Sequence, residues 1–394
     1  MFDAGLLQRA WRIWWNEGGA ALVDRVWRRY RRSRAVTALH HATTKTFHDE
    51  RHGPSAIEYA DRLKGEIENF RNVKSVHDLP DIFHYWSQKF LLPKFQALNI
   101  PGVTELFVRY VADACQSQRG DMCHVASLGT GNCEAEIAMA EQLVASGITT
   151  FQLDCIEVNP HMLARGKELA ASKKILPYLR FVESDVKSWS CENEYAVIVA
   201  NQSLHHFQDL EVLFEKIRCA IGESGVFVVS DVIGRNGHMR WPEALEVIRE
   251  IWKTMPERYK YNHLLSRYEH MYENWDCSVG GFEGIRAQDI LPLLADTFEF
   301  ELFLAYGNII DIFIDRAFGH NFDIQVDADK EFIERIARLD EELLAAGTIK
   351  PTHLIASMRN SSTMNRQVYR HFTPAFCLRS TDSAGSIMKM GQAS

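Results

Sequence analysis

The chain has 394 residues, of which 46% are hydrophobic and 24% are charged, with a net charge of −8. These values are typical of a globular protein, and the length suffices for one large domain with accessory elements or for two domains. No apolar run approaches the roughly 18 residues of a membrane span, and the eight cysteines form no C-x-x-C pair. We therefore expect reduced thiols, no zinc knuckle, no secretory signal and a cytoplasmic location.

Residues 1–36 differ from the rest of the chain in charge. Eight arginines against three acidic residues give this segment a net charge of +5, so the remainder is acidic. An acidic body argues against a general nucleic-acid-binding protein. Leu7, Trp11, Trp14 and Trp15 recur at helical spacing, which predicts amphipathic helices. Their aromatic face is expected either to pack on the protein or on a protein partner, or to lie on a membrane surface.

The rest of the chain divides by its patterns. Residues 37–120 predict a helical cap with little strand character. Strand and helix patterns alternate from residue 121, which predicts an α/β domain over 121–358 with helical insertions at 234–297 and 309–350. Residues 359–394 are rich in Ser, Thr and Asn, and we expect a flexible tail there.

A glycine-containing loop opens the α/β domain, in the run SLGTGNCE at 127–134. Gly129 and Gly131 follow a predicted strand and precede a helical pattern. Glycine at the end of such a strand lets the backbone approach a ligand closely, and Ser127 and Asn132 flank it as further contacts. By itself this loop suits several nucleotide cofactors, including a nicotinamide dinucleotide.

Polar residues follow the next three predicted strands of the domain. Glu157 ends the second strand, where its carboxylate can accept both hydroxyls of a ribose. Asp185 follows the third strand and can accept from the exocyclic amine of an adenine. The neighbouring residues expected to contact a cofactor are Val158, Asn159, Val186, Asn201 and Gln202.

This series resembles the class I S-adenosylmethionine (SAM) methyltransferases over residues 121–233. The resemblance implies a Rossmann-like α/β sheet of seven strands with the last antiparallel, with SAM as cofactor, S-adenosylhomocysteine (SAH) as product and no metal. Ser127 stands where the family often has an acid, and Cys133 where it has a third glycine. The runs at 233–244 and 281–290 resemble a bacterial subgroup of predicted methyltransferases that are often encoded among carbohydrate-modifying genes.

Three histidines are candidate general bases. In the family that the chain resembles, the loop after the fourth strand lies beside the transferable methyl group, and His205 and His206 fall in it. An imidazole exchanges a proton near neutral pH, so either could deprotonate an acceptor hydroxyl. His238, after the fifth strand, is a third candidate. Packing or cofactor contact is the alternative role for the pair after the fourth strand.

Several further residues are expected to contact ligands. Asp231, Trp241 and Trp275 are predicted to bind the acceptor, because aromatic faces with polar tips suit a sugar or polyketide ring. Tyr85 and Trp86 are predicted to cover the methionine end of the cofactor. Helix packing is the alternative for the aromatic residues, and a local cap on the following loop is the alternative for Asp231.

The sequence therefore predicts an enzyme that methylates a small-molecule or glycan-linked acceptor, with a hydroxyl as the methylated group. Methylation of nitrogen or carbon in a natural product is the alternative within the same class. A catalytically silent scaffold subunit with a SAM-binding fold is the alternative outside it, and the intact glycine loop with its acidic partners argues against that reading.

Overall fold

The computed structural model describes residues 56–69, 79–118, 121–190, 194–279, 281–361 and 365–379. The predicted helices of residues 1–36 lie outside the described residues. The chain divides into two compact units, each built from three stretches of sequence. The sheet unit comprises the described residues of Lys94–Asn236, Gly284–Tyr306 and Gly347–Ser394. The helical unit comprises the described residues of Met1–Pro93, Gly237–Glu283 and Gly307–Ala346.

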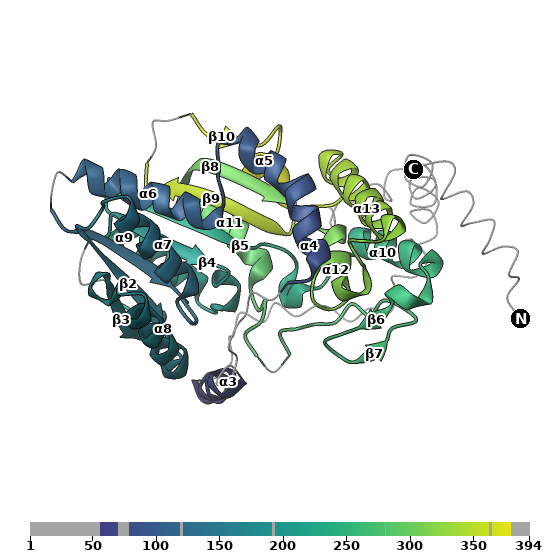
Figure 1. Ribbon diagram of the computed structural model, residues 1–394, viewed down its shortest axis with the longest axis horizontal. Helices are drawn as coiled ribbons and strands as arrows, with labels where there is room; N and C mark the ends of the chain where they lie inside the picture. Colours follow the sequence, from purple (N-terminus) through teal and green to yellow (C-terminus); the bar gives the residue numbers. More distant parts are fainter. Residues whose placement is uncertain are drawn as a thin grey trace, which may run out of the picture. The chain divides into compact units, whose positions relative to one another are not determined.

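The sheet unit contains an eight-stranded sheet in the order β10-β8-β9-β5-β4-β1-β2-β3 (Figure 1). Its strands are β1 (Cys123–Leu128), β2 (Phe151–Glu157), β3 (Leu179–Glu183), β4 (Val197–Asn201), β5 (Val226–Val232), β8 (Glu299–Tyr306), β9 (His353–Arg359) and β10 (Gln367–Val368). β9 runs antiparallel to both β5 and β8, and the other pairs are parallel. The predicted Rossmann-like sheet is confirmed, with β10 added as an eighth, edge strand.

The central strands are apolar runs that are buried along their length. β4 reads Val-Ile-Val-Ala before Asn201, and all four apolar residues are buried. Such continuous runs are expected for parallel strands covered by helices on both faces of a sheet. The helices of this unit are α6 (Val103–Ser117), α7 (Glu134–Ala145), α8 (Pro160–Ser172), α9 (Leu210–Ala220), α11 (Ala287–Thr297) and α14 (Pro374–Cys377), with 3₁₀ turns at η4 (Leu176–Tyr178) and η5 (Leu204–His206).

The units differ from the predicted domain boundaries in three places. α6 lies within the predicted cap at 37–120 but packs on α7, β1 and β4 of the sheet unit. α11 lies within the predicted insertion at 234–297 but packs on α9. Residues 365–379, expected to be part of a flexible tail, form β10, which pairs with β8, and α14. Sequence periodicity alone does not assign a packing partner to any of these elements.

The helical unit is built around aromatic side chains. Trp252 is 1% exposed, and its ring packs against the rings of Phe313 and Phe318. The described elements are α3 (Ala56–Asn69), α4 (Asp81–Trp86), η3 (Ser87–Leu91), α10 (Pro242–Thr254), η7 (Glu257–Tyr259), β6 (Tyr261–Asn262), β7 (Arg267–Tyr268), α12 (Ile309–Ile314), η8 (Gly319–Asn321) and α13 (Asp327–Ala345). α5 (Leu92–Ala97) and η6 (Asn236–His238) include two of the points where the chain passes from one unit to the other. Within the described ranges, no helix has the length and apolar character needed to cross a membrane.

Candidate active site

The register of the sheet brings the ends of the parallel strands into line. Leu128 of β1 pairs with Ile156 of β2 and with Ala200 of β4. Asn201, at the end of β4, pairs with Ser230 of β5. Residues that follow these positions therefore lie along one edge of the sheet, which is where open α/β sheets bind ligands.

The glycine loop makes a close backbone approach to the loop after β4. Gly129 has a φ of +68°, and a Cβ built on it would lie 2.7 Å from the Cβ of Ser203 and 3.1 Å from the ring of Phe207. The Ser203 hydroxyl is buried there with no hydrogen-bond partner among the described residues. A larger residue at Gly129 would therefore clash and would also be strained. The orphaned hydroxyl and the glycine cradle fit a polar cofactor laid across this edge.

Glu157 holds the glycine loop to the end of β2. Its Oε2 accepts from the Gly131 amide at 2.9 Å, and its Oε1 accepts from the Asn159 amide at 2.9 Å. Burial raises the pKa of the Glu157 carboxyl, while these amides act in the opposite direction. Each carboxylate oxygen has a second lone pair, so the group keeps the capacity to accept from a ribose hydroxyl.

Cys133 explains why the loop retains its shape without a third glycine. It adopts a left-handed backbone with φ 58° directly before α7, the conformation that glycine adopts without strain. Its side chain is fully buried. Asn132, next to it, is also buried and accepts a hydrogen bond from the Arg165 Nε at 2.9 Å. The departure from the family pattern therefore changes the residue and preserves the turn.

The other predicted cofactor residues lie along the same edge. Asp185 is half-buried after β3, and its Oδ1 accepts from the Lys187 amide at 2.9 Å. Gln202 is exposed, with a left-handed φ of 53°, directly after β4. Val158 and Val186 are half-buried beside Glu157 and Asp185. Their contacts with a cofactor stay a prediction.

Asp231 and His205 form a buried hydrogen-bonded pair. The Nδ1 of His205 lies 2.6 Å from the Oδ1 of Asp231, and the two residues are 5% and 0% exposed. Oδ2 of Asp231 accepts from the amides of Ser203 and Leu204 at 2.9 and 2.7 Å. Oδ1 also accepts from the Val232 amide at 2.7 Å. Asp231 thus fixes both the loop after β4 and the ring of His205.

This arrangement differs from the predicted contact between Asp231 and the acceptor. The carboxylate has no exposed surface, and its hydrogen bonds go to its own chain. Burial alone would raise the pKa of Asp231, but the charge that His205 carries when protonated, its hydrogen bond and the amides hold that pKa below its usual range. Asp231 is therefore ionised at neutral pH. His206 is half-buried beside this pair, with its ring centroid 4.3 Å from that of His205.

Arg286 fixes the far end of the loop after β4. Its Nη1 donates to the Gln208 carbonyl at 2.9 Å, and its guanidinium pairs with the carboxylates of Glu211 and Asp289. Asn236 and Gln288 bind each other through reciprocal side-chain contacts with backbone amides, the shorter at 3.1 Å. These bonds join two of the motifs of the bacterial subgroup within the sheet unit. Residue spacing alone gives no signal that they meet.

A buried carboxyl in α7 was missed by sequence reasoning. Glu136 is 3% exposed, and its Oε1 accepts from the Ser127 hydroxyl at 2.6 Å. Burial raises the pKa of this carboxyl to about 7. Its position among the buried residues Ile137 and Ala140 of the same helix was the available signal, since acids seldom occupy an inward helix face.

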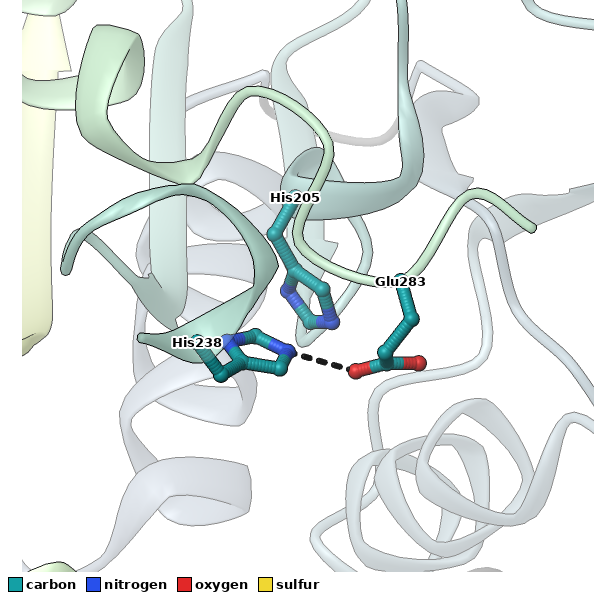
Figure 2. A group of neighbouring side chains, drawn as sticks. All are labelled: His205, His238 and Glu283. Atoms are coloured by element: carbon teal, nitrogen blue, oxygen red, sulfur yellow. Dashed lines mark hydrogen bonds and ion pairs between the residues drawn. The ribbon is translucent and has the colours of Figure 1, made fainter. Parts of the chain in front are cut away.

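His238 has a carboxylate partner of its own in the helical unit. Its Nε2 lies 2.6 Å from the Oε1 of Glu283, the contact drawn as a dashed line in Figure 2. His238 has a left-handed φ of 54°, and it follows Gly237, where a Cβ would lie 1.9 Å from the Oδ1 of Asp276. Non-glycine residues in this conformation are uncommon and concentrate at functional sites. A catalytic role for His238 stays a prediction.

The remaining predicted ligand contacts belong to the helical unit. The Tyr85 hydroxyl donates to Glu334 at 2.5 Å, and Trp86 is buried with its ring 5.8 Å from that of Phe83. Trp241 is half-buried directly before α10, whereas Trp275 is 60% exposed. Tyr85 and Trp86 thus have packing and hydrogen-bonding roles within their own unit. Contacts of these four residues with cofactor or acceptor stay predictions.

A comparison with protein families identifies the sheet unit's central part. The model of the family described as "Methyltransferase domain" matches residues 125–225. Residues 125–225 are a methyltransferase domain. The match runs from within β1 to the residue before β5, and so covers the glycine loop, Glu157, Asp185 and the loop after β4. A methyltransferase domain of this class implies SAM and SAH as its ligands.

Solved structures that resemble the chain are distant from it. The DszA carbon methyltransferase matches at 14% identity and a TM-score of 0.30, over 34% of this chain and 36% of its own. The chain therefore spans about a third of that protein. An O-methyltransferase of a polyketide synthase multienzyme from Brevibacillus brevis, in complex with SAH, matches at 13% identity and a TM-score of 0.38, over 66% of this chain and 78% of its own.

A third match is a putative sarcosine dimethylglycine methyltransferase from Galdieria sulphuraria. It has 11% identity and a TM-score of 0.39, over 68% of this chain and 96% of its own. No curated protein matches the sequence. The assignment of the methyltransferase domain therefore stands on the family match and on the strand order of the sheet.

Proposed function

We propose that this protein transfers a methyl group from SAM to a hydroxyl of a small molecule or of a glycan-linked acceptor. The observation that carries the proposal is the buried pair of His205 and Asp231, in the loop after β4 of the methyltransferase domain. A transfer to oxygen needs a group that removes the hydroxyl proton, and a histidine held by a carboxylate is suited to that task.

The hydrogen bond to Asp231 determines which ring nitrogen of His205 carries the proton. Because Asp231 is ionised and accepts at 2.6 Å, the proton of a neutral His205 ring lies on Nδ1. Nε2 is then the acceptor nitrogen of the ring. After it takes up a proton, the imidazolium is stabilised by the same carboxylate, as in other histidine and carboxylate pairs.

The proposed methyl transfer needs only the acceptor, SAM and His205. SAM supplies a methyl group on a sulfonium, which leaves its bonding electron pair on sulfur when the carbon–sulfur bond breaks. The acceptor oxygen forms the new carbon–oxygen bond, and its proton goes to Nε2 of His205. Because the side chain of His205 is only 6% exposed, we expect Nε2 to exchange its proton with a bound acceptor before it exchanges with bulk water. Orientation of the acceptor supplies much of the remaining acceleration.

The residues proposed to contact the cofactor lie along one edge of the sheet. Gly129 and Gly131 give the backbone approach, Glu157 accepts from the ribose hydroxyls, and Asp185 accepts from the adenine amine. Asn201 and the other residues that follow the strands complete the contact surface. The Ser203 hydroxyl lies beside Gly129 and has no hydrogen-bond partner among the described residues, so it also suits a polar cofactor at this edge.

The decisive experiment screens acceptors with the purified protein. Sugars, sugar nucleotides and polyketide-like alcohols are incubated with SAM, and the methylated atom is located by tandem mass spectrometry and NMR. The proposal expects a methyl ether. A product methylated on nitrogen or carbon would contradict the proposed hydroxyl acceptor, and failure of the protein to bind SAM at micromolar concentration would contradict the enzyme assignment.

A further inference from the structure

Glu136 is a buried carboxyl next to the cofactor loop that the proposed reaction does not use. It lies in the first turn of α7, the helix that the glycine loop opens. Its Oε1 accepts from the Ser127 hydroxyl at 2.6 Å. Its Oε2 is buried and has no hydrogen-bond partner among the described residues. Half of this carboxyl is therefore unsatisfied, although buried polar groups are rarely left so.

The groups of the same helix, loop and strand that face Glu136 do not neutralise its charge. Glu134 and Glu157 are carboxyls whose negative charges disfavour its ionisation. The thiol of Cys155 lies near it on β2 and is hydrogen-bonded to the thiol of Cys133. Both thiols are buried. An ionised Glu136 would thus sit among like charges and neutral groups.

Glu136 is also not paired with a cation of the neighbouring helices in the part of the chain that the structure describes. Arg109 of α6 and Arg165 of α8 belong to two helices that pack on α7. Arg109 donates to the Asn99 carbonyl at 2.6 Å, and Arg165 donates to the Asn132 amide oxygen at 2.9 Å. Over the described residues, Glu136 takes part in no ion pair. Its charge state is therefore sensitive to any positive charge that arrives at the loop.

The two cofactor forms differ by such a charge. SAM has a sulfonium, whereas SAH has a neutral thioether, and the rest of the two molecules is alike. A positive charge brought near a buried carboxyl favours its ionised form, and removal of that charge favours the protonated form. Since the pKa of the Glu136 carboxyl lies near 7, a modest shift changes its protonation at physiological pH.

We propose that Glu136 is a positioning residue that senses the charge of the bound cofactor, losing a proton when SAM binds and regaining one when SAH takes its place. The inference rests on the proposed function, because it requires SAM at the glycine loop. The proposed proton exchange gives Glu136 two charge states, one with each form of the cofactor. With SAM, an ionised carboxylate accepts fully from Ser127 and stabilises the sulfonium. With SAH, the carboxyl is protonated and carries no charge that would favour a cation at the loop.

Proton release on binding tests the proposal directly. Calorimetric titrations with SAM and with SAH at pH 7 are compared in two buffers of different ionisation enthalpy, which yields the number of protons released. At a pH equal to the pKa of the carboxyl, the limit for one group is about half a proton. We expect the wild type to release a measurable part of this with SAM and less with SAH, and the Glu136→Gln variant to lose the difference.

Two further variants keep the test decisive. Glu141→Gln removes a partly exposed carboxylate from the same helix and should leave the proton release unchanged. Ser127→Ala removes the hydrogen bond that lowers the pKa of Glu136, and should move the pH of maximal release upward. Equal release with SAM and SAH, or a difference that persists in Glu136→Gln, would overturn the inference while leaving SAM binding intact. Absence of binding by the wild type would instead overturn the proposed function.

Discussion

Substitution of Asp231 by asparagine removes one charge from the centre of the candidate active site and preserves its shape. Asparagine has one acceptor oxygen where the carboxylate has two. If that oxygen still accepts from the amides of Ser203 and Leu204, only the Val232 amide loses its hydrogen bond. In the opposite orientation, the amides of Ser203 and Leu204 both lose theirs. The first orientation is therefore favoured, and it turns the new NH₂ group toward the Nδ1 of His205.

That orientation fixes the wrong tautomer of the imidazole. Nδ1 must then accept a hydrogen bond, so the proton of His205 moves to Nε2, which can no longer take the acceptor proton. A general base contributes about 10²–10⁴-fold to a rate. We therefore expect Asp231→Asn to lower kcat by about two to four orders of magnitude, which is about 3–5 kcal/mol of activation free energy. The unpaired Val232 amide adds a loss of about 1–3 kcal/mol in the free energy of unfolding.

The assay measures SAH formation with saturating acceptor, together with the affinity for SAM by calorimetry. The SAM affinity should stay close to the wild-type value, because Asp231 has no exposed surface. Asp209→Asn is the matched control, since this half-exposed carboxylate precedes α9 in the same loop and pairs with Lys187. A folded Asp231→Asn protein with wild-type kcat would refute the assignment of His205 and Asp231 as base and positioning residue.

Three further predictions concern the sheet unit. Since the pKa of Glu136 is about 7 in the fold and about 4.3 in an unfolded chain, its contribution to stability is present below pH 4.3 and is lost as pH rises through 7. In the wild type, the free energy of unfolding measured by chemical denaturation should fall by about 3 kcal/mol between pH 4 and 8 because of this group. In Glu136→Gln this part of the fall should be absent. Gly129→Ala should abolish SAM binding in calorimetry, because its Cβ would clash with Ser203. Tyr195→Phe removes a hydrogen bond of 2.8 Å to the buried carboxylate of Asp154 and should cost about 1–3 kcal/mol of unfolding free energy.

Each of these variants has a control that differs in one respect. Glu141→Gln should keep the pH dependence of stability, because its carboxylate is only partly buried. Gly65→Ala should keep SAM binding, because a Cβ there meets nothing within 4 Å. Tyr178→Phe should leave stability near the wild-type value, since its ring stacks on Phe151 and its hydroxyl makes no hydrogen bond to the described residues. Retained SAM binding by Gly129→Ala, or an unchanged denaturation midpoint for Tyr195→Phe, would show that these contacts are absent in solution.

The positions of the central strands along the chain were accessible from the sequence, because these strands are short apolar runs that end in polar residues. Glu157 could be placed at the end of β2 for this reason, and the register confirms that placement. Periodicity could not assign partners to amphipathic helices, so α6 and α11 were grouped with the wrong neighbours. β10 was missed because two paired residues leave almost no pattern in a sequence.

The sequence by itself determined the methyltransferase sheet, the position of its glycine loop and the acids that follow β2 and β3. These are local features, since a strand, a turn and the residue after them are neighbours along the chain. Only the tertiary structure decided that Asp231 holds His205 and that the buried Glu136 bonds to Ser127 with one oxygen of its carboxyl unpaired. The first contact depends on β4 lying beside β5 in a fixed register. The second depends on how α7 packs against the end of β1, and neither contact exists until that packing is formed.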